Sequence, residues 1–147
     1  MLKVLIAEDE LMIADLLEET LITSGYEVCG IARTVDEAVT LAELHKPDLA
    51  VLDVRLAGGV GPEVARRVSN RGTMGILYAT GDDVRHSKLT RADGNAAIAK
   101  PYRKEDVVQA LIIVQDIMTL GNATRSFPMG FRLLPEATAR PTEVPLA

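Results

Sequence analysis

The chain has 147 residues, of which 16 are basic and 21 acidic, so its formal net charge is −5, and 48% of its residues are hydrophobic. This length suits one domain of ordinary size, and the composition is too apolar for a disordered chain. Because the acidic balance comes without clusters of lysine and arginine, it also argues against nucleic-acid binding.

Cysteine usage and hydropathy indicate the compartment. Cys29 is the single cysteine, so an intramolecular disulfide is impossible and no oxidising compartment is required. The apolar N-terminal run meets Glu8-Asp9-Glu10 before a signal-peptide core could form, and no apolar stretch approaches the ~20 residues of a membrane span. We therefore expect a cytoplasmic protein without membrane contact.

Short apolar segments alternate with segments of helical periodicity as far as residue 120. Strands are predicted at 2–7, 26–31, 48–53, 75–80 and 96–99. Helices are predicted from 11 to 21, from 35 to before Pro47, from Pro62 to 68, over the polar stretch 82–92, and from 104 to 120. Five βα units of this kind predict a doubly wound, flavodoxin-like α/β fold, a (βα)5 sandwich with a five-stranded parallel sheet.

The last part of the chain has a different composition. Four of the seven prolines lie in residues 122–147, which are predicted to form a non-helical extension, without an output domain, to a domain of residues 1–121. Alternate residues from 127 to 133 are apolar, a pattern that a free tail does not need. We expect the segment 127–134 to dock on its own domain or on a second protomer in a homodimer.

Polar side chains stand at the carboxyl ends of four predicted strands, where a doubly wound fold binds its ligands. They are Glu8 and Asp9 after the first strand, Asp53 in the third, Thr80 in the fourth and Lys100 after the fifth. Close carboxylates repel by about 4 kcal/mol per pair at an effective dielectric of about 20, so the three acids need a cation or protonation. Mg²⁺, which prefers oxygen ligands and leaves a position for a phosphoryl oxygen, fits this need.

The same residues suggest phosphoryl chemistry. Asp53 ends the central strand and can act as a nucleophile that becomes an acyl phosphate. The Lys100 ammonium would neutralise phosphate charge, and the Thr80 hydroxyl would donate a hydrogen bond to a phosphate oxygen.

These residues resemble the receiver domain of two-component response regulators, and the resemblance extends over residues 2–120. The motifs that carry it are Glu8-Asp9, Asp53 within Val51-Leu52-Asp53-Val54-Arg55-Leu56, Thr80-Gly81 and Lys100-Pro101. It implies that Asp53 is the phosphoacceptor and that Thr80 and Lys100 contact the phosphate. It further implies Mg²⁺ ligation by Glu8, Asp9, Asp53 and the Arg55 backbone carbonyl, and a cis bond before Pro101.

Two positions depart from the usual pattern of the family. Ala97 stands where receivers usually carry an aromatic side chain whose rotation reports phosphorylation. The run Tyr78-Ala79-Thr80-Gly81 instead resembles a subset of stand-alone receivers with a Phe-Ala-Thr-Gly-like motif, which implies a switch through ordering of the loop at Gly81. Tyr102, after Lys100-Pro101, is placed to line a partner-facing surface.

Two residues flank the expected entry path of water. Arg55 lies two residues after Asp53, and Asp82 lies two residues after Thr80. An ion pair between Arg55 and Asp82 would slow hydrolysis of the acyl phosphate.

The resemblance implies a stand-alone response regulator in a phosphorelay. A sensor histidine kinase or phosphotransfer protein would phosphorylate Asp53 with Mg²⁺, and the output would be a protein–protein interaction. The protein would not be an enzyme beyond its own phosphoryl transfer and autodephosphorylation.

Three other functions stay open. An Asp-nucleophile phosphohydrolase would need a second acid where Arg55 stands, and a cap domain. A flavodoxin-like FMN protein would meet repulsion between its phosphate and the acids after the first strand. A phosphorylation-independent receiver-like interaction module is the third.

Overall fold

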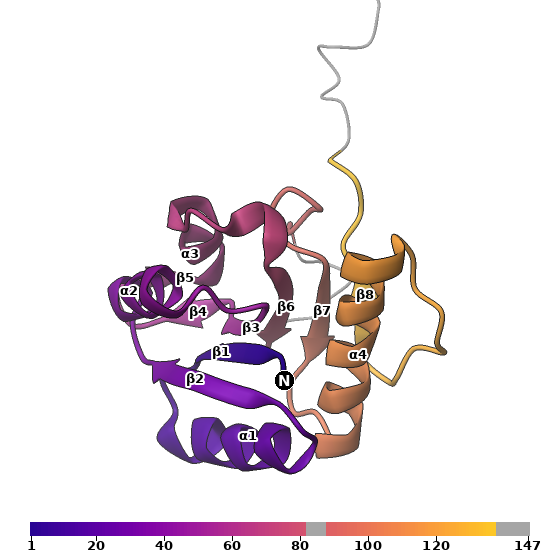
Figure 1. The fold of residues 1–147 in the computed structure, drawn as a ribbon, viewed down its shortest axis with the longest axis horizontal. Coiled ribbons are helices and arrows are strands. Elements are labelled where there is room, and N and C mark those ends of the chain that lie inside the picture. Colours follow the sequence, from indigo (N-terminus) through magenta and orange to yellow (C-terminus); the bar gives the residue numbers. More distant parts are fainter. Residues whose placement is uncertain (82–87, 138–147) are drawn as a thin grey trace, which may run out of the picture.

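A six-stranded sheet forms the centre of the computed structural model, which describes residues 1–81 and 88–137. The strand order is β2-β1-β3-β6-β7-β8; the first five strands are parallel, and β8 is antiparallel to β7 (Figure 1). The strands are β1 (Lys3–Ala7), β2 (Glu27–Ala32), β3 (Leu49–Asp53), β6 (Gly75–Thr80), β7 (Ala96–Ala99) and β8 (Phe131–Leu133). The predicted doubly wound sandwich with five parallel strands is confirmed, and β8 adds a sixth.

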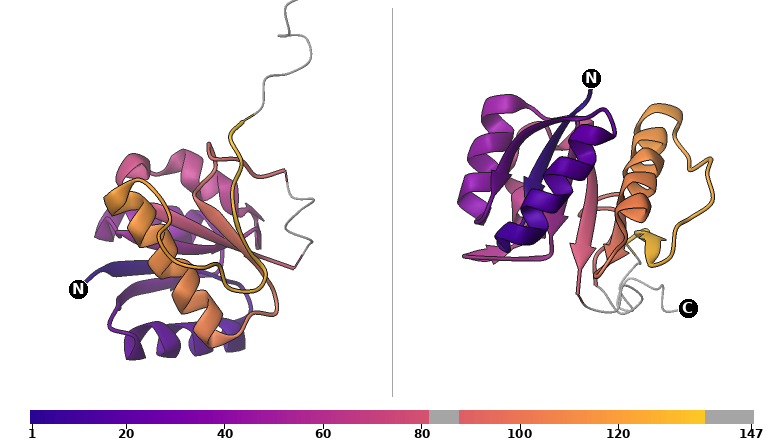
Figure 2. Two further views of the ribbon diagram at one scale, coloured as in Figure 1. Left: turned by 90° about the vertical axis from the view of Figure 1, so that its right-hand side faces the viewer. Right: turned by 90° about the horizontal axis from the view of Figure 1, so that it is seen from below.

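Helices cover both faces of the sheet (Figure 2). The four α-helices of the described residues are α1 (Leu11–Thr23), α2 (Val35–His45), α3 (Gly61–Arg67) and α4 (Lys104–Leu120). Helices α1 and α4 pack on one face, and α2 and α3 pack on the other, so the core has two apolar layers. None of the helices in the described part of the chain has the length and apolar character that crossing a bilayer requires.

The prediction of a helix over 82–92 is wrong for its described part. Residues 88–92 form no helix, and residues 82–87 lie outside the described residues. The Asp93 carboxylate accepts the Thr90 backbone N–H at 2.9 Å, and the Thr90 hydroxyl accepts the Ala92 N–H at 3.3 Å. Side chains that bond the local backbone in this way favour a turn over a helix.

The C-terminal extension returns to its own domain. Phe131, Arg132 and Leu133 pair with Ile98, Ala97 and Ala96 at the edge of the sheet. Figure 2 shows the loop after α4 that brings this segment back alongside the helix. Of the two docking sites expected for 127–134, the structure therefore contains the one within the same chain.

A short hairpin follows the central strand, and a glycine holds it close to Asp53. Strands β4 (Arg55–Leu56) and β5 (Gly59–Val60) pair antiparallel, and the Gly61 N–H then donates to the Val54 carbonyl at 2.8 Å. A Cβ on Gly61 would lie 2.4 Å from the backbone oxygen of Asp53, which is a steric clash. Position 61 therefore has to be glycine for Asp53 to keep its place.

Gly61→Ala tests this constraint. The added methyl group must displace the backbone at Asp53, so we expect the free energy of unfolding to fall by about 1–3 kcal/mol. Gly72→Ala is the matched control, because a Cβ there meets no atom within 4 Å. Urea denaturation compares the two variants, and equal stability would show that the backbone at Asp53 yields without cost.

Candidate functional site

An acidic cluster lies at the carboxyl edge of the parallel sheet. Glu8 and Asp9 follow β1, and Asp53 ends β3, the neighbouring strand. One carboxylate oxygen from each residue lies within 4.8 Å of the others, which is close enough to hold one metal ion. Glu8 is buried, and Asp9 and Asp53 are half-buried, so a ligand can reach the cluster from solvent.

Lys100 connects two of these acids. Its ammonium Nζ lies 2.7 Å from Glu8 Oε1 and 3.0 Å from Asp53 Oδ2. The remaining oxygens accept backbone N–H groups: Glu8 Oε2 accepts from Glu10 at 3.1 Å, and Asp53 Oδ1 accepts from Arg55 at 3.2 Å. Both carboxylates are thus oriented by one cation and one amide each.

The pKa values of Glu8 and Lys100 are both raised, but for different reasons. Burial raises the pKa of Glu8, and the charge of Asp53 adds to this, although the hydrogen bonds from Lys100 and Glu10 oppose it. Burial also acts to lower the pKa of Lys100, but the hydrogen bonds and charges of Glu8 and Asp53 outweigh it and raise that pKa. Lys100 therefore stays protonated at neutral pH.

Thr80 lies between the acids and Lys100 along the sheet. It ends β6, the strand between β3 and β7, and only 3% of its surface is exposed. Its carbonyl accepts the Lys100 N–H at 2.7 Å, which ties the two strand ends together. Gly81 follows as an exposed residue with no atom within 4 Å of an added Cβ.

The position of the missing aromatic is part of the packed core. Ala97 is fully buried and is paired with Tyr78 of β6. The Tyr78 ring is itself fully buried, and its hydroxyl donates to the Asp93 carbonyl at 2.7 Å. Burial raises the pKa of Tyr78, with the charge of Asp93 adding to the effect, so this hydroxyl remains a donor.

The segment after β7 lines a cavity beside the site. The Lys100–Pro101 bond is cis, as the resemblance implied. A cavity of about 300 Å³ is lined by Glu10, Ile13, Lys100, Pro101 and Tyr102. Tyr102 is half-buried, and burial raises its pKa to about 12.

The predicted pairing of Arg55 with Asp82 stays a prediction, because Asp82 lies outside the described residues. Arg55 itself is exposed on β4. Sequence reasoning missed the Glu10 amide that orients Glu8 and the close approach of Gly61 to Asp53. The glycine-rich run 57–61 was a signal for the second feature, but it indicated a turn and not a contact.

The fold and this edge define a class: a doubly wound domain with three carboxylates, a threonine and a lysine at the ends of its strands. The chain belongs to the response regulator receiver domain family, because the model of that family matches residues 4–112. Domains of this family are signalling modules that work in two-component systems.

Individual relatives agree with this assignment. The chain is 37% identical over 111 residues to the transcriptional regulatory protein PdtaR of Mycobacterium tuberculosis, which is 74% of this chain and 54% of PdtaR. It thus spans about half the length of this relative. A CheY-like receiver domain from Methanospirillum hungatei superposes with a TM-score of 0.74 at 26% identity, over 83% of this chain and 99% of that one. A mutant of the anti-anti-sigma factor PhyR from Bartonella quintana gives a TM-score of 0.67 at 29% identity, over 83% of this chain and 50% of that one.

Lys100→Met tests the electrostatic account of the site. Removing the cation leaves Glu8 and Asp53 facing each other, so we expect the free energy of unfolding to fall by about 3 kcal/mol at neutral pH. A carboxyl group whose folded pKa is raised destabilises the fold when ionised. The loss should therefore be complete above that pKa and shrink as the pH falls through it and Glu8 takes up a proton.

Urea denaturation at neutral and acidic pH measures both effects. Lys46→Met is the control, because Lys46 is half-exposed and pairs with an exposed Glu43, so less than about 1 kcal/mol should be lost. A loss for Lys100→Met that does not change with pH would contradict the role assigned to Glu8.

Proposed function

We propose that this chain is a phosphate-accepting receiver, in which Asp53 takes a phosphoryl group from a phosphohistidine of a sensor histidine kinase or phosphotransfer protein. The observation that carries the proposal is the position of Asp53 within 4.8 Å of two further carboxylates and in contact with the Lys100 ammonium. An aspartate that only ended a strand would not need two further carboxylates and an ammonium group around it.

In the proposed reaction, a carboxylate oxygen of Asp53 attacks the phosphorus atom. The P–N bond to the donor imidazole breaks, and the ring nitrogen keeps the electron pair and takes up a proton. Lys100, which already bonds Glu8 and Asp53, would turn to the phosphoryl oxygens. The Thr80 hydroxyl would donate to another of these oxygens, since the strand that Thr80 ends lies between the strands of Asp53 and Lys100.

The donor set at the site fits Mg²⁺. Glu8, Asp9, Asp53 and the Arg55 backbone carbonyl supply hard oxygen ligands of the kind that this ion prefers. When bound, Mg²⁺ would neutralise charge on the transferring phosphoryl group. The ion would also replace the need for Lys100 as the counter-charge of Asp53, which leaves Lys100 available to the phosphate.

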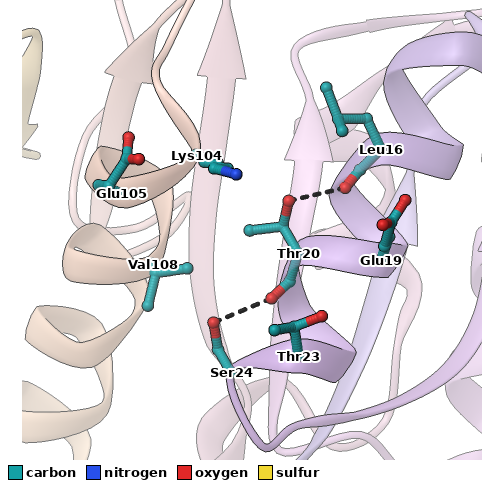
Figure 3. Close-up of a pocket in the computed structure, with 8 residues that line it drawn as sticks. All are labelled: Leu16, Glu19, Thr20, Thr23, Ser24, Lys104, Glu105 and Val108. Carbon is teal, nitrogen blue, oxygen red and sulfur yellow. Dashed lines mark hydrogen bonds between the residues drawn. The ribbon is translucent and has the colours of Figure 1, made fainter.

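Helix α1 is the proposed docking surface for the phosphoryl donor. Leu11, Met12 and Leu16 are 54%, 86% and 60% exposed, so they leave an apolar surface on α1. A cavity of about 420 Å³ continues this surface between α1 and α4, with Thr20 and Lys104 among its lining residues (Figure 3). An apolar surface beside the acidic edge suits a helix of the donor protein.

The proposed output is a protein–protein interaction in the cytoplasm. PdtaR is named as a transcriptional regulatory protein and PhyR as an anti-anti-sigma factor, which supports a regulatory role here. We propose residues 1–121 as the receiver and 122–147 as an extension without an output domain. A homodimer, and a switch through ordering of the loop at Gly81 in place of an aromatic at position 97, remain part of the proposal.

The phosphohydrolase alternative is less well supported. Arg55 stands where such an enzyme would carry its second acid, and its side chain is exposed on β4. A positive charge there cannot take the role of a general acid or base in the way that a carboxyl group does.

Incubation with acetyl phosphate and Mg²⁺ tests the proposal. We expect one phosphoryl group to be added to the intact mass, to be absent after Asp53→Ala, and to be lost when Mg²⁺ is chelated. Asp9→Asn should weaken Mg²⁺ binding and so raise the Mg²⁺ concentration that phosphorylation requires, because it removes one of three anionic ligands.

Asp36→Ala serves as the control, since Asp36 is an exposed aspartate whose pair with Arg67 lies on α2 and α3. The Asp36→Ala chain should gain the same phosphoryl adduct as the unchanged chain. An adduct that survives Asp53→Ala, or no adduct from either acetyl phosphate or a panel of histidine kinases, would overturn the assignment of Asp53.

A further inference from the structure

The segment 130–136 lies along the outer edge of β7 and continues past the three residues of β8. Its backbone bonds run from Ala99 N–H to Gly130 O (3.0 Å), from Leu134 N–H to Asn95 O (3.0 Å) and from Arg91 N–H to Pro135 O (2.8 Å). The segment therefore behaves as an added strand over residues 91–99. This is the geometry by which an extended peptide joins the edge of a sheet.

Two side chains of the segment fill core positions on opposite faces of the sheet. Leu134 is 3% exposed and joins the apolar cluster that contains Ala97 and Tyr78. Phe131 is 9% exposed and joins the cluster on the α4 side. Since Ala97 has only a methyl group, the Leu134 side chain completes this cluster, and the edge selects an apolar residue at each of these two positions.

The rest of the segment contributes little to its attachment. Arg132, Pro135 and Glu136 are exposed, and the Arg91–Glu136 pair is long, at 3.8 Å between exposed side chains. Exposed ion pairs of this kind add little stability. Few buried side-chain contacts are a feature of segments that open locally at low cost.

The first contact of the segment is adjacent to the phosphoryl site. The Ala99 N–H that bonds Gly130 belongs to the residue before Lys100, and the Lys100 N–H bonds the Thr80 carbonyl. A Cβ on Gly130 would lie 3.3 Å from the Ala99 side chain, so the backbones are in close contact. A backbone shift at Lys100 that accompanies new contacts with phosphoryl oxygens would therefore reach this contact through a single peptide bond.

We propose that the edge of β7 is a strand-accepting interaction surface, closed by residues 130–136 and opened when Asp53 is phosphorylated. Its partner presents an extended segment with apolar residues at the positions of Phe131 and Leu134. The coupling to phosphorylation rests on the proposed function, whereas strand acceptance does not. In the unphosphorylated chain, the tethered segment competes with the partner at high effective concentration.

A labelled peptide with the sequence of residues 129–137 tests strand acceptance by fluorescence anisotropy with the full chain. Leu134→Asp in the chain places a charge in the apolar cluster and releases the segment, so peptide affinity should rise by about tenfold or more. The same peptide carrying Leu134→Asp should not bind. Leu44→Asp in the chain is the control, because Leu44 is an exposed residue of α2 and its change should leave affinity as it was.

Circular dichroism checks that the variants are folded, and Leu134→Ala provides a milder opening with an intermediate gain in affinity. A folded Leu134→Asp or Leu134→Ala chain that binds the peptide no better than the unchanged chain would overturn strand acceptance. Sedimentation of the unchanged chain identifies one further outcome. A dimer that the peptide dissociates would show that the occupant is a second copy of this chain and would overturn the assignment to a different partner.

The coupling is tested in the same assay after acetyl phosphate and Mg²⁺, with intact mass measured on each sample. Phosphorylated chain should bind the peptide about tenfold more tightly, and the Leu134→Asp chain should show no further gain. A phosphoryl adduct with unchanged affinity would overturn the coupling. No adduct would overturn the proposed function and the coupling with it, while the Leu134 variants still decide strand acceptance.

Discussion

The bonds from Lys100 to Glu8 and Asp53 are the interaction on which the site depends. Parallel pairing of β1 and β3 brings two carboxylates to the same edge, where their repulsion opposes the fold. Lys100 leaves β7, which is separated from β3 by β6, so its long side chain has to cross the end of β6 to reach them. Thr80 lies at that crossing and receives the backbone N–H of Lys100.

Much of this arrangement could be predicted from the sequence, because it follows from strand ends. The apolar runs ending at Asp53, Thr80 and Lys100 place those residues at one edge once the sheet is parallel. This pattern does not predict which of the three carboxylates Lys100 bonds. The bonds to Glu8 and Asp53 depend on burial of Glu8 and on the backbone amides of Glu10 and Arg55, which orient the two carboxylates. These are properties of the packed site.

The burial of helix α1 and the strand formed by the tail could not be predicted, because tertiary packing decides them and the local sequence pattern does not. Leu11 and Leu16 continue a helical apolar pattern but remain exposed, because the sheet is covered by residues such as Leu17 and Leu21. The tail shows the reverse case. Docking of this segment is predicted, but its prolines indicate a non-helical extension and give no sign of a strand. Phe131 and Leu134 bury their side chains because β7 leaves an open edge that needs backbone partners.

The two proposed interaction surfaces lie on different sides of the site, and this bears on how a signal can pass. Helix α1 packs near β1 and β2, whereas β8 lies at the opposite edge of the sheet (Figure 1). A phosphoryl donor on α1 would therefore leave the β7 edge accessible. Since Lys100 contacts the acids through its ammonium and is adjacent to Ala99 along the chain, one residue connects the two sides. A change of partner for that ammonium is thus the shortest route from the acidic cluster to the strand that closes the sheet.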